Sequence, residues 1–187
     1  MNVLIIFDHP RRDSFCGAVL DAFVQGLDEA GHKIEIADLR AEGFDPRLPP
    51  EDEPDWANAA KIYSPAVLAE QTRIERNDAI AFVFPVWWWS VPATTKGWID
   101  RVWNNGWAYG TSSLSLKKAR MLAVAASDAE QYAKRRYDDA MLTQLVTGIL
   151  NYCGIEDASL ELLHGSTGQD VDRQNILKAA SQIGRTF

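Results

Sequence analysis

Residues 79–89 of this chain read Ala79-Ile80-Ala81-Phe82-Val83-Phe84-Pro85-Val86-Trp87-Trp88-Trp89. The first six are apolar without alternating polar positions, a pattern typical of a strand that is buried on both faces of a sheet. A proline ends this strand, and three adjacent tryptophans follow it. Aromatic surface on a loop after a buried strand favours a binding site for a planar ligand. A subunit interface or a corner of the core is the alternative.

Four more apolar segments flank this strand along the chain, and helical patterns separate them. We expect strands at residues 3–8, 33–38, 79–84, 120–126 and 159–163. We expect helices at residues 14–30, 65–76, 93–103, 137–152 and 171–183, with Gly31 and Gly154 ending the first and the fourth. This alternation predicts an open α/β fold whose parallel sheet is covered by helices on both faces. Ligands of such sheets bind beyond the carboxyl ends of the strands.

Length and composition predict one domain, residues 1–187. Hydrophobic residues make up 47% of the chain, which allows a core without metals or disulfides. The net charge of -7 and the pI near 4.9 argue against nonspecific binding to nucleic acid or to an anionic membrane. Two cysteines, no basic leader and no long apolar segment predict a cytoplasmic protein without an integral membrane segment. The proline-rich, acidic residues 41–57 are interpreted as a surface excursion.

The loop between the first strand and the first helix has side chains that suit an anion. His9 opens the loop, Arg11 and Arg12 follow, and Ser14 precedes the helix. A helix start offers unpaired backbone amides and a positive dipole end, so we interpret this loop as a phosphate or pyrophosphate site. An ordinary helix cap by Asp13 or Ser14 is the alternative. The sequence contains neither a P-loop nor the Gly-x-Gly-x-x-Gly pattern of Rossmann dinucleotide sites.

The helix after the tryptophans mixes apolar and charged positions. Trp98 and Trp103 have helical spacing, and we predict that they pack in the core. Asp100 and Arg101 are predicted to form exposed ion pairs of little energetic weight. A third loop, residues 125–132, follows the fourth strand and would close over the same crevice as the first two loops.

Two isolated residues receive mainly structural interpretations. Cys16, at a helix start, would be reactive if its pKa were lowered, but a small packing residue is the favoured interpretation. His164, at the end of the fifth strand, is interpreted as a structural or solvent-facing histidine. No grouping of histidines, cysteines and carboxylates predicts a metal site.

Three motifs lie in and near these loops. His9 is followed after four residues by Ser14-Phe15-Cys16; residues 84–93 lead into Lys96-Gly97-Trp98 and Arg101-Val102; and Trp107-Ala108-Tyr109 comes next. Together with the third loop they resemble the flavodoxin-like NAD(P)H:quinone oxidoreductases, the family of mammalian quinone reductases and bacterial modulators of drug activity. The resemblance spans most of the chain. The resemblance implies a flavodoxin-like doubly wound sheet of five parallel strands in the order 2-1-3-4-5.

The same resemblance implies an activity and a set of site residues. The activity is hydride transfer from NAD(P)H to a flavin and then transfer of two electrons to a quinone or similar planar acceptor. The flavin is FAD, with FMN as the alternative, because Asp100 and Arg173 stand where the family places side chains near the adenosine. The implied cofactor-binding residues are His9, Ser14, Phe15, Cys16, Pro85, Val86, Trp87, Trp88, Trp89, Asp100, Ala126, Ser127, Tyr132 and Arg173. The implied catalytic residues are Tyr132, Trp88, Trp89 and Tyr109, and Tyr109, together with Trp107, would reach the partner subunit of a homodimer.

The chain departs from the family pattern at the first loop and, most of all, in the third loop, where Val124-Ala125-Ala126-Ser127 replace Thr-Thr-Gly-Gly. Cys16 stands in place of an asparagine, and Asp138 in place of the histidine that accompanies the tyrosine at position 132. The altered third loop keeps two other functions open: a redox-sensing regulatory subunit of a potassium efflux system, and a one-electron flavodoxin-type carrier. A third possibility is a vestigial flavin site whose tryptophans serve an interface. The choice between NADH and NADPH and the physiological acceptor are open at this point.

Overall fold

Five parallel strands form one sheet in the order β2-β1-β3-β4-β5, as the sequence predicts. The computed structural model describes residues 1–187. The strands are β1 (Asn2–Phe7), β2 (Lys33–Asp38), β3 (Ala79–Pro85), β4 (Lys118–Val124) and β5 (Ala158–Leu163). All four pairings between neighbours are parallel, and β3 is buried along its whole length. The carboxyl ends of β1, β3 and β4 therefore meet at one edge of the sheet.

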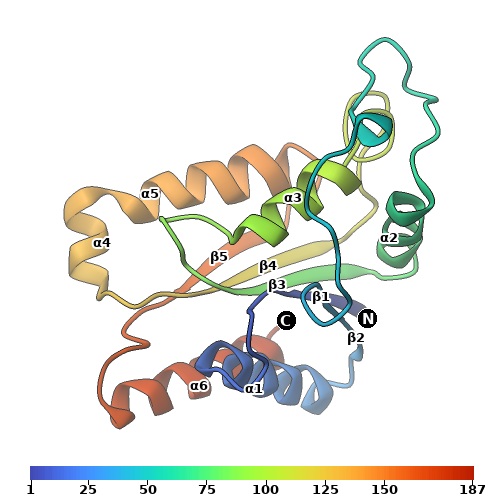
Figure 1. Ribbon diagram of the computed structural model, residues 1–187. Coiled ribbons are helices and arrows are strands. Elements are labelled where there is room, and N and C mark those ends of the chain that lie inside the picture. Colours follow the sequence, from blue (N-terminus) through green and yellow to red (C-terminus); the bar gives the residue numbers. More distant parts are fainter.

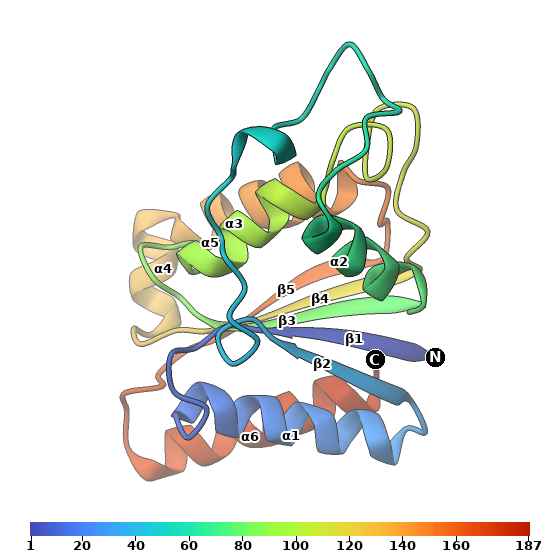
Figure 2. The same cartoon turned by 45° about the vertical axis from the view of Figure 1, so that its right-hand side comes forward.

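Helices cover both faces of the sheet (Figures 1 and 2). One face carries α1 (Phe15–Glu29) and α6 (Asp170–Arg185), and the other carries α2 (Pro65–Glu75), α3 (Ala93–Val102), α5 (Tyr137–Met141) and the π-helix η2 (Leu142–Asn151). The short helix α4 (Ala129–Arg135) lies at the end of the sheet where β4 stops. None of these helices is both long and apolar enough to cross a membrane.

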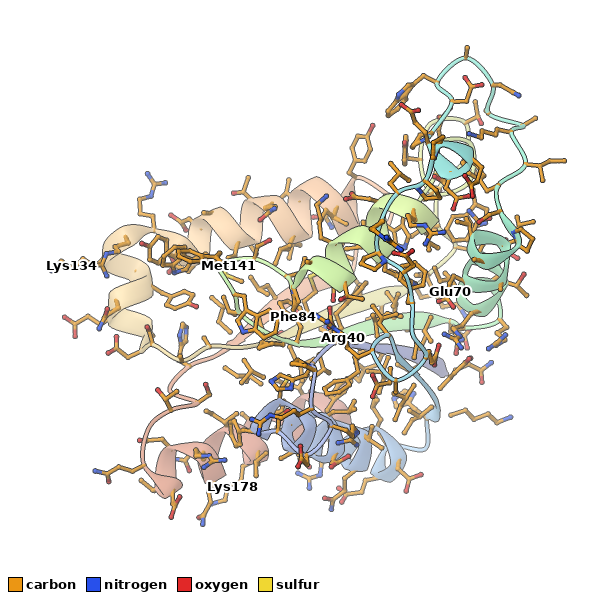
Figure 3. The ribbon with its side chains drawn as sticks, viewed as in Figure 1. Arg40, Glu70, Phe84, Lys134, Met141 and Lys178 are labelled. Atoms are coloured by element: carbon orange, nitrogen blue, oxygen red, sulfur yellow. The ribbon has the colours of Figure 1, made fainter.

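The strand residues alternate between two hydrophobic cores. Leu4 and Ile6 of β1 pack with the core under α2, α3 and η2, whereas Val3, Ile5 and Phe7 pack with the core under α1 and α6. Phe84, at the end of β3, points into the first of these cores (Figure 3). Both faces of β1 and β3 are thus buried, which explains their continuous apolar runs. The edge strands β2 and β5 are mostly half-buried or exposed, so the expectation that all five strands are buried was wrong for these two.

Local signals in the sequence set the helix ends. Ser14 caps α1 by accepting a hydrogen bond from the Gly17 amide, and Gly31 follows that helix with φ of 76°. Helices α1 and α6 cross closely at Gly26, where an added Cβ would stand 2.0 Å from the Ser181 carbonyl oxygen. Trp98 and Trp103 are buried in the core, which confirms their predicted packing role.

The fourth helical segment differs from the prediction of one helix over residues 137–152. The structure has α4 first, so Tyr132 lies in a helix rather than in a loop. Asp128 caps α4, and Arg136, with φ of 58°, ends it before α5 begins. The continuation is a π-helix from Leu142. Sequence periodicity missed these features because a left-handed arginine has no distinctive sequence signal. Strand β4 also lies two residues earlier than predicted, because Lys118 already pairs with Ala79.

Residues 41–63 form a long arm beside α3, irregular except for the short helix η1 (Pro50–Asp52), in agreement with the predicted excursion. A buried ion pair anchors the arm: the Arg101 guanidinium donates to the Asp52 carboxylate at 2.7 Å. The same carboxylate accepts the amide and the hydroxyl of Ser64, both at 2.9 Å. The prediction of an exposed ion pair at Arg101 was wrong, since sequence spacing gives no sign of a partner 49 residues away.

Candidate functional site

A buried carboxylate joins the first two predicted site loops. Asp8, the residue after β1, accepts hydrogen bonds from the Thr95 amide at 2.8 Å and from the Thr95 hydroxyl at 2.9 Å. The Arg40 guanidinium pairs with the other oxygen of this carboxylate at 2.8 Å. Asp8 thus fixes the start of α3 against the end of β1. The positive end of the α3 dipole stabilises the negative charge of Asp8. The sequence interpretation gave Asp8 no such role, although a carboxylate at the end of a buried strand is a usable signal.

The tryptophan run forms a two-residue hairpin turn. The backbones of Trp87 and Ser90 exchange two hydrogen bonds, of 3.3 and 3.2 Å. Between them, Trp88 and Trp89 both have positive φ, 54° and 53°. Positive φ at both central positions is the signature of a type I′ turn, which prefers Asn-Gly because other side chains strain it. The presence of two tryptophans in such a turn indicates that their indoles have a function of their own.

The two indoles of this turn have different surroundings. Trp88 is 87% exposed, whereas Trp89 is 38% exposed because it stacks on Tyr137 at 4.0 Å between ring centroids. Pro85 is buried at the end of β3, and Val86 is half-buried. The Val86 amide donates to the Val124 carbonyl at 2.9 Å, so the turn is attached to the end of β4.

The start of α1 presents free backbone amides. Gly17 and Ala18 donate to Ser14, while the amides of Phe15 and Cys16 have no partner in the chain. Arg12 bends back onto α1, where it pairs with Asp21 and donates to the Gly17 carbonyl at 3.2 Å. The predicted phosphate site therefore rests on the amides and on Ser14, and not on Arg12.

His9 and Arg11 complete the first loop. The His9 ring lies 6.2 Å from the Trp87 ring, so the first loop and the turn are neighbours. The Arg11 amide is 3.1 Å from His9 Nδ1, and Arg11 itself is exposed.

The thiol of Cys16 is shielded from solvent. Burial, and secondarily the nearby Asp8 carboxylate, raises the pKa of Cys16 to about 12. Burial likewise raises the pKa of Cys153 to about 11. A lowered pKa at Cys16, one of the two possibilities weighed from the sequence, is therefore wrong, because desolvation and the Asp8 charge outweigh the nearby Arg12 charge.

We expect neither thiol to react rapidly with Ellman's reagent at pH 8 in the folded protein, because almost no thiolate is present. Two thiols should react within seconds after unfolding in guanidinium chloride. Time courses of the absorbance at both conditions check this result. A fast thiol in the folded protein would contradict it, and a Cys153→Ser variant would assign the reacting group.

The third loop rests on the loop after β5. The carbonyl of Ala126 accepts the Thr167 hydroxyl at 3.3 Å, and that of Ser127 accepts the Gly165 amide at 3.3 Å. Ala126 and Ser127 are themselves exposed. This contact between two loops of different strands could not be predicted from the pattern of either loop.

Tyr132 is buried and meets His164 edge to face, with ring centroids 4.7 Å apart. Burial raises the pKa of the Tyr132 hydroxyl, which keeps it protonated at neutral pH. Nδ1 of His164 lies 3.2 Å from the Ser127 carbonyl oxygen. His164 thus brings an imidazole to the tyrosine from β5, whereas Asp138 occupies the position where the family pattern has a histidine.

Two more predicted residues meet at the starts of α1 and α6. The Arg173 guanidinium lies over the Phe15 ring, 4.5 Å from its centroid.

Asp100 is an exposed residue of α3, and its carboxylate pairs with the Lys96 ammonium at 2.6 Å. Helix α3 covers the opposite face of the sheet from α6 (Figure 1). Within one subunit, Asp100 and Arg173 are therefore not brought together.

Tyr109 lies away from Tyr132, in an aromatic row with Trp56 at 5.6 Å and Tyr152 at 5.8 Å. Trp56 is 74% exposed. The indole nitrogen of Trp107 donates to Glu75 of α2 at 2.8 Å, and the expected reach of Trp107 toward a partner subunit stays a prediction.

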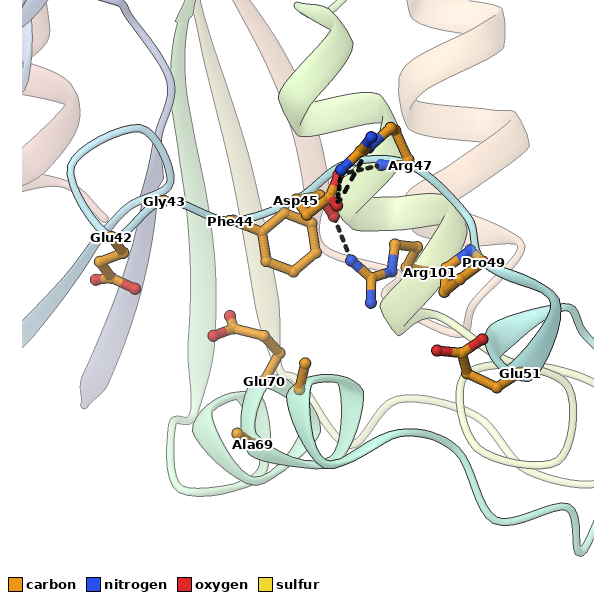
Figure 4. A pocket seen from close by; sticks show the side chains of 11 residues that line it. Glu42, Gly43, Phe44, Asp45, Arg47, Pro49, Glu51, Ala69, Glu70 and Arg101 are labelled. Carbon is orange, nitrogen blue, oxygen red and sulfur yellow. Dashed lines mark hydrogen bonds and ion pairs between the residues drawn. The ribbon is translucent and has the colours of Figure 1, made fainter.

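One cavity lies away from the three site loops, and another borders the third loop. The first, of about 720 Å³, opens between the arm and α2, and its wall contains Phe44, Arg101 and Glu70 (Figure 4). Among its charged groups, Asp45 pairs with Arg47, whereas Glu42 and Glu70 pair with Arg73. The second, of about 510 Å³, lies between β5, α4 and α6 and includes His164. The structure contains no group of three metal-ligating side chains.

Comparisons with known proteins agree with this geometry. A family model described as a flavodoxin-like fold matches residues 1–187. An uncharacterized NAD(P)H oxidoreductase of Escherichia coli (strain K12), YcaK, is 38% identical over 163 residues, which cover 87% of this chain and 83% of the relative. NAD(P)H dehydrogenase (quinone) 1 of Cavia porcellus is 30% identical and covers 88% of this chain and 68% of its own. The solved NAD(P)H:quinone oxidoreductase from Methanothermobacter marburgensis has a TM-score of 0.95 at 36% identity, covering 100% of this chain and 96% of that one.

Proposed function

This chain belongs to the family with the flavodoxin-like fold, and from that membership we propose that it is a flavin-dependent NAD(P)H oxidoreductase that reduces a quinone or a similar planar acceptor. The observation that carries the proposal is the strained turn at Trp88 and Trp89. It presents two indoles at the carboxyl end of β3, where ligands of doubly wound sheets bind. If only the backbone conformation of this turn mattered, Asn-Gly would be the expected sequence at its two central positions.

The donors at this edge of the sheet fit a flavin. The free amides of Phe15 and Cys16 suit the negative charge of a phosphate. At the turn, the amides of Trp87 and Ser90 serve the hairpin, which leaves those of Trp88 and Trp89 for the polar edge of the ring system. Exposed Ala126 and Ser127 have small side chains that allow the ring edge to approach the third loop.

A bound flavin would accept a hydride from NAD(P)H and pass two electrons to the acceptor. The protein binds, orients and supplies hydrogen bonds. Trp88 and Trp89 provide flat walls, and the protonated Tyr132 hydroxyl is a donor for negative charge that develops on the ligand. The dry surroundings of Tyr132 strengthen such a hydrogen bond.

We further propose FAD rather than FMN as the cofactor. Phe15 and Arg173 form a stacked cation and ring beside the amides at the start of α1. Such a pair suits a second aromatic base, which FAD has and FMN lacks. Asp100 would have to contribute from a second copy, because it lies across the sheet from Arg173 within one subunit.

We also propose a homodimer. One reason is that Asp100 could approach Arg173 only from a second copy, and the other is an exposed row of aromatic residues. Trp56, Tyr109 and Tyr152 form an apolar surface on the side of α3 and η2. Exposed aromatic clusters of this kind mark interfaces. Burial of this row against a second copy would bring Tyr109 toward the partner's crevice. Sedimentation velocity on the wild-type protein and on a Tyr152→Glu variant tests this: the variant should shift toward the monomer.

The proposed function is tested first by the absorbance spectrum of the purified protein. We expect the visible absorbance bands of a bound flavin, release of FAD on chromatography of the denatured protein, and steady NAD(P)H oxidation with menadione. A colourless protein that takes up neither FAD nor FMN would refute the proposal. Reduction only by another redox protein would instead indicate a flavodoxin-type carrier. Copurification with a transporter and negligible quinone turnover would indicate a regulatory subunit, an outcome that Asp138 keeps open.

Tyr132→Phe should lower the turnover number with menadione about tenfold, because one hydrogen bond of about 1.4 kcal/mol is lost. Flavin content should be unchanged. Steady-state kinetics and the visible spectrum measure the two quantities. Tyr63→Phe is a matched control, since the Tyr63 hydroxyl is buried without a partner and lies in the arm. An equal loss of turnover in both variants would remove Tyr132 from the proposed role.

A further inference from the structure

Tyr137 is in contact with aromatic groups from two different site loops. Its ring stacks on Trp89, with centroids 4.0 Å apart and planes at 28°. Its edge meets Tyr132 at 5.9 Å and 84°. Trp89 follows β3 and Tyr132 follows β4, so one side chain at the start of α5 connects the segments that follow two neighbouring strands. Nothing in the sequence pattern singled out Tyr137 for this position.

The position of Tyr137 is set by the backbone around it. Arg136 has φ of 58° and separates α4 from α5, which makes Tyr137 the first residue of α5. The ring is half-buried and packs on the core beneath α3 and η2. A second link lies nearby, since the Ser90 hydroxyl donates to the Gln144 side chain at 3.3 Å. The turn after β3 is therefore held against α5 and η2 at two points.

The stack affects the two indoles of the turn unequally. Trp88, which has no stacking partner in the chain, meets only the edge of Trp89, at 6.0 Å and 73°. Tyr137 covers one face of Trp89, and the Trp89 side chain is still 38% exposed. A strained backbone directs both indoles, but only Trp89 also has a side-chain support. Trp89 is therefore a fixed flat surface, and Trp88 a freely accessible one.

We propose that Tyr137 is a specificity-determining residue of the acceptor pocket, which it shapes by holding the Trp89 indole as a fixed wall. The proposal rests on the proposed function for its effect on turnover. The Tyr137 ring backs one face of Trp89 and so holds this wall in place. A wall that cannot move back disfavours an acceptor of three fused rings relative to one of two. Without the ring, Trp89 can move back and admit the larger acceptor.

The test compares two acceptors and three variants. Tyr137→Leu removes the flat ring while it keeps apolar volume, and Tyr137→Phe keeps the stack. We expect kcat/KM for menadione relative to anthraquinone-2-sulfonate to fall about tenfold in Tyr137→Leu, in proportion to the loss of one aromatic pair. Tyr137→Phe should retain the wild-type ratio. Leu142→Ala, a change at an exposed apolar residue that follows α5, is the matched control and should also retain it.

A second readout does not depend on turnover. Near-ultraviolet circular dichroism of the flavin-free protein should lose a tryptophan band in Tyr137→Leu and keep it in Tyr137→Phe and Leu142→Ala. An unchanged acceptor ratio in a folded Tyr137→Leu protein overturns the proposal, as does a change shared by Leu142→Ala. If no variant and no wild type oxidises NAD(P)H, the proposed function has failed. In that case an unchanged dichroism band in Tyr137→Leu would show, in addition, that Tyr137 does not hold the Trp89 indole.

Discussion

Replacement of Asp52 by alanine is expected to lower the free energy of unfolding by about 3–5 kcal/mol. Asp52 is fully buried, and its carboxylate is the partner of the buried Arg101 guanidinium and of Ser64. Its removal leaves a buried cation without its counter-ion and unties the arm from α3. Chemical denaturation of the wild type and the variant, with equal slopes against denaturant concentration, measures the difference.

Asp45→Ala is the matched control for this prediction. Asp45 pairs with the exposed Arg47, and such surface pairs contribute less than about 1 kcal/mol. Its backbone oxygen, which accepts from Arg101, remains in the variant. Equal losses of unfolding free energy in Asp45→Ala and Asp52→Ala would show that the buried ion pair stabilises the protein no more than the surface pair does.

The contribution of Asp52 also depends on pH with a definite sign. Burial raises the pKa of Asp52, but the hydrogen bonds from Arg101 and Ser64 outweigh burial, so the pKa lies below its usual 3.8. A carboxyl group with a lowered pKa in the folded state stabilises the protein above the unfolded value and loses this effect as pH falls through the folded value. The difference between the wild type and Asp52→Ala should therefore narrow below about pH 4.

The double replacement Trp88→Asn and Trp89→Gly should lower kcat/KM for menadione by about 10- to 100-fold, because two aromatic contacts of about 0.5–1.5 kcal/mol each are lost. The thermal stability of the protein should remain close to that of the wild type. Asparagine and glycine relieve positive φ at both positions, a gain of about 2 kcal/mol that offsets the lost stack on Tyr137.

Steady-state kinetics and thermal unfolding of the same preparations separate these two effects. Ile62→Asn is the control, since Ile62 is another exposed apolar residue and lies in the arm. A double variant with wild-type kinetics would mean that the indoles do not line the acceptor pocket. A marked loss of stability would mean that the turn owes its shape to the indoles and not to the backbone.

Much of the fold could be predicted from the sequence because burial on both faces leaves a local signal. β3, between Ala79 and Pro85, is apolar at every position, and Ser14 is recognisable as a helix cap. The family could be predicted for a related reason, since its motifs are short and contiguous. Both the strand order and the family membership are confirmed.

The parts that could not be predicted depend on contacts between distant segments or on unusual backbone. His164 meets Tyr132, and Arg101 meets Asp52, only after the chain has folded. Trp88 and Trp89 are poor candidates for a type I′ turn by any residue preference, so their conformation is invisible in the sequence. Their role as predicted flavin-site residues, like that of the other predicted site residues, stays a prediction.

The strand order has a consequence for synthesis of the chain. β1 is made first but lies in the interior of the sheet, between β2 and β3. Its second neighbour begins at Ala79, so one of its edges has no partner until the ribosome has passed that point. β3 in turn waits for β4 at Lys118. Unpaired apolar edges of this kind recruit other chains. The nascent chain is therefore most prone to aggregate while its first half is already outside the ribosome and its second half is not.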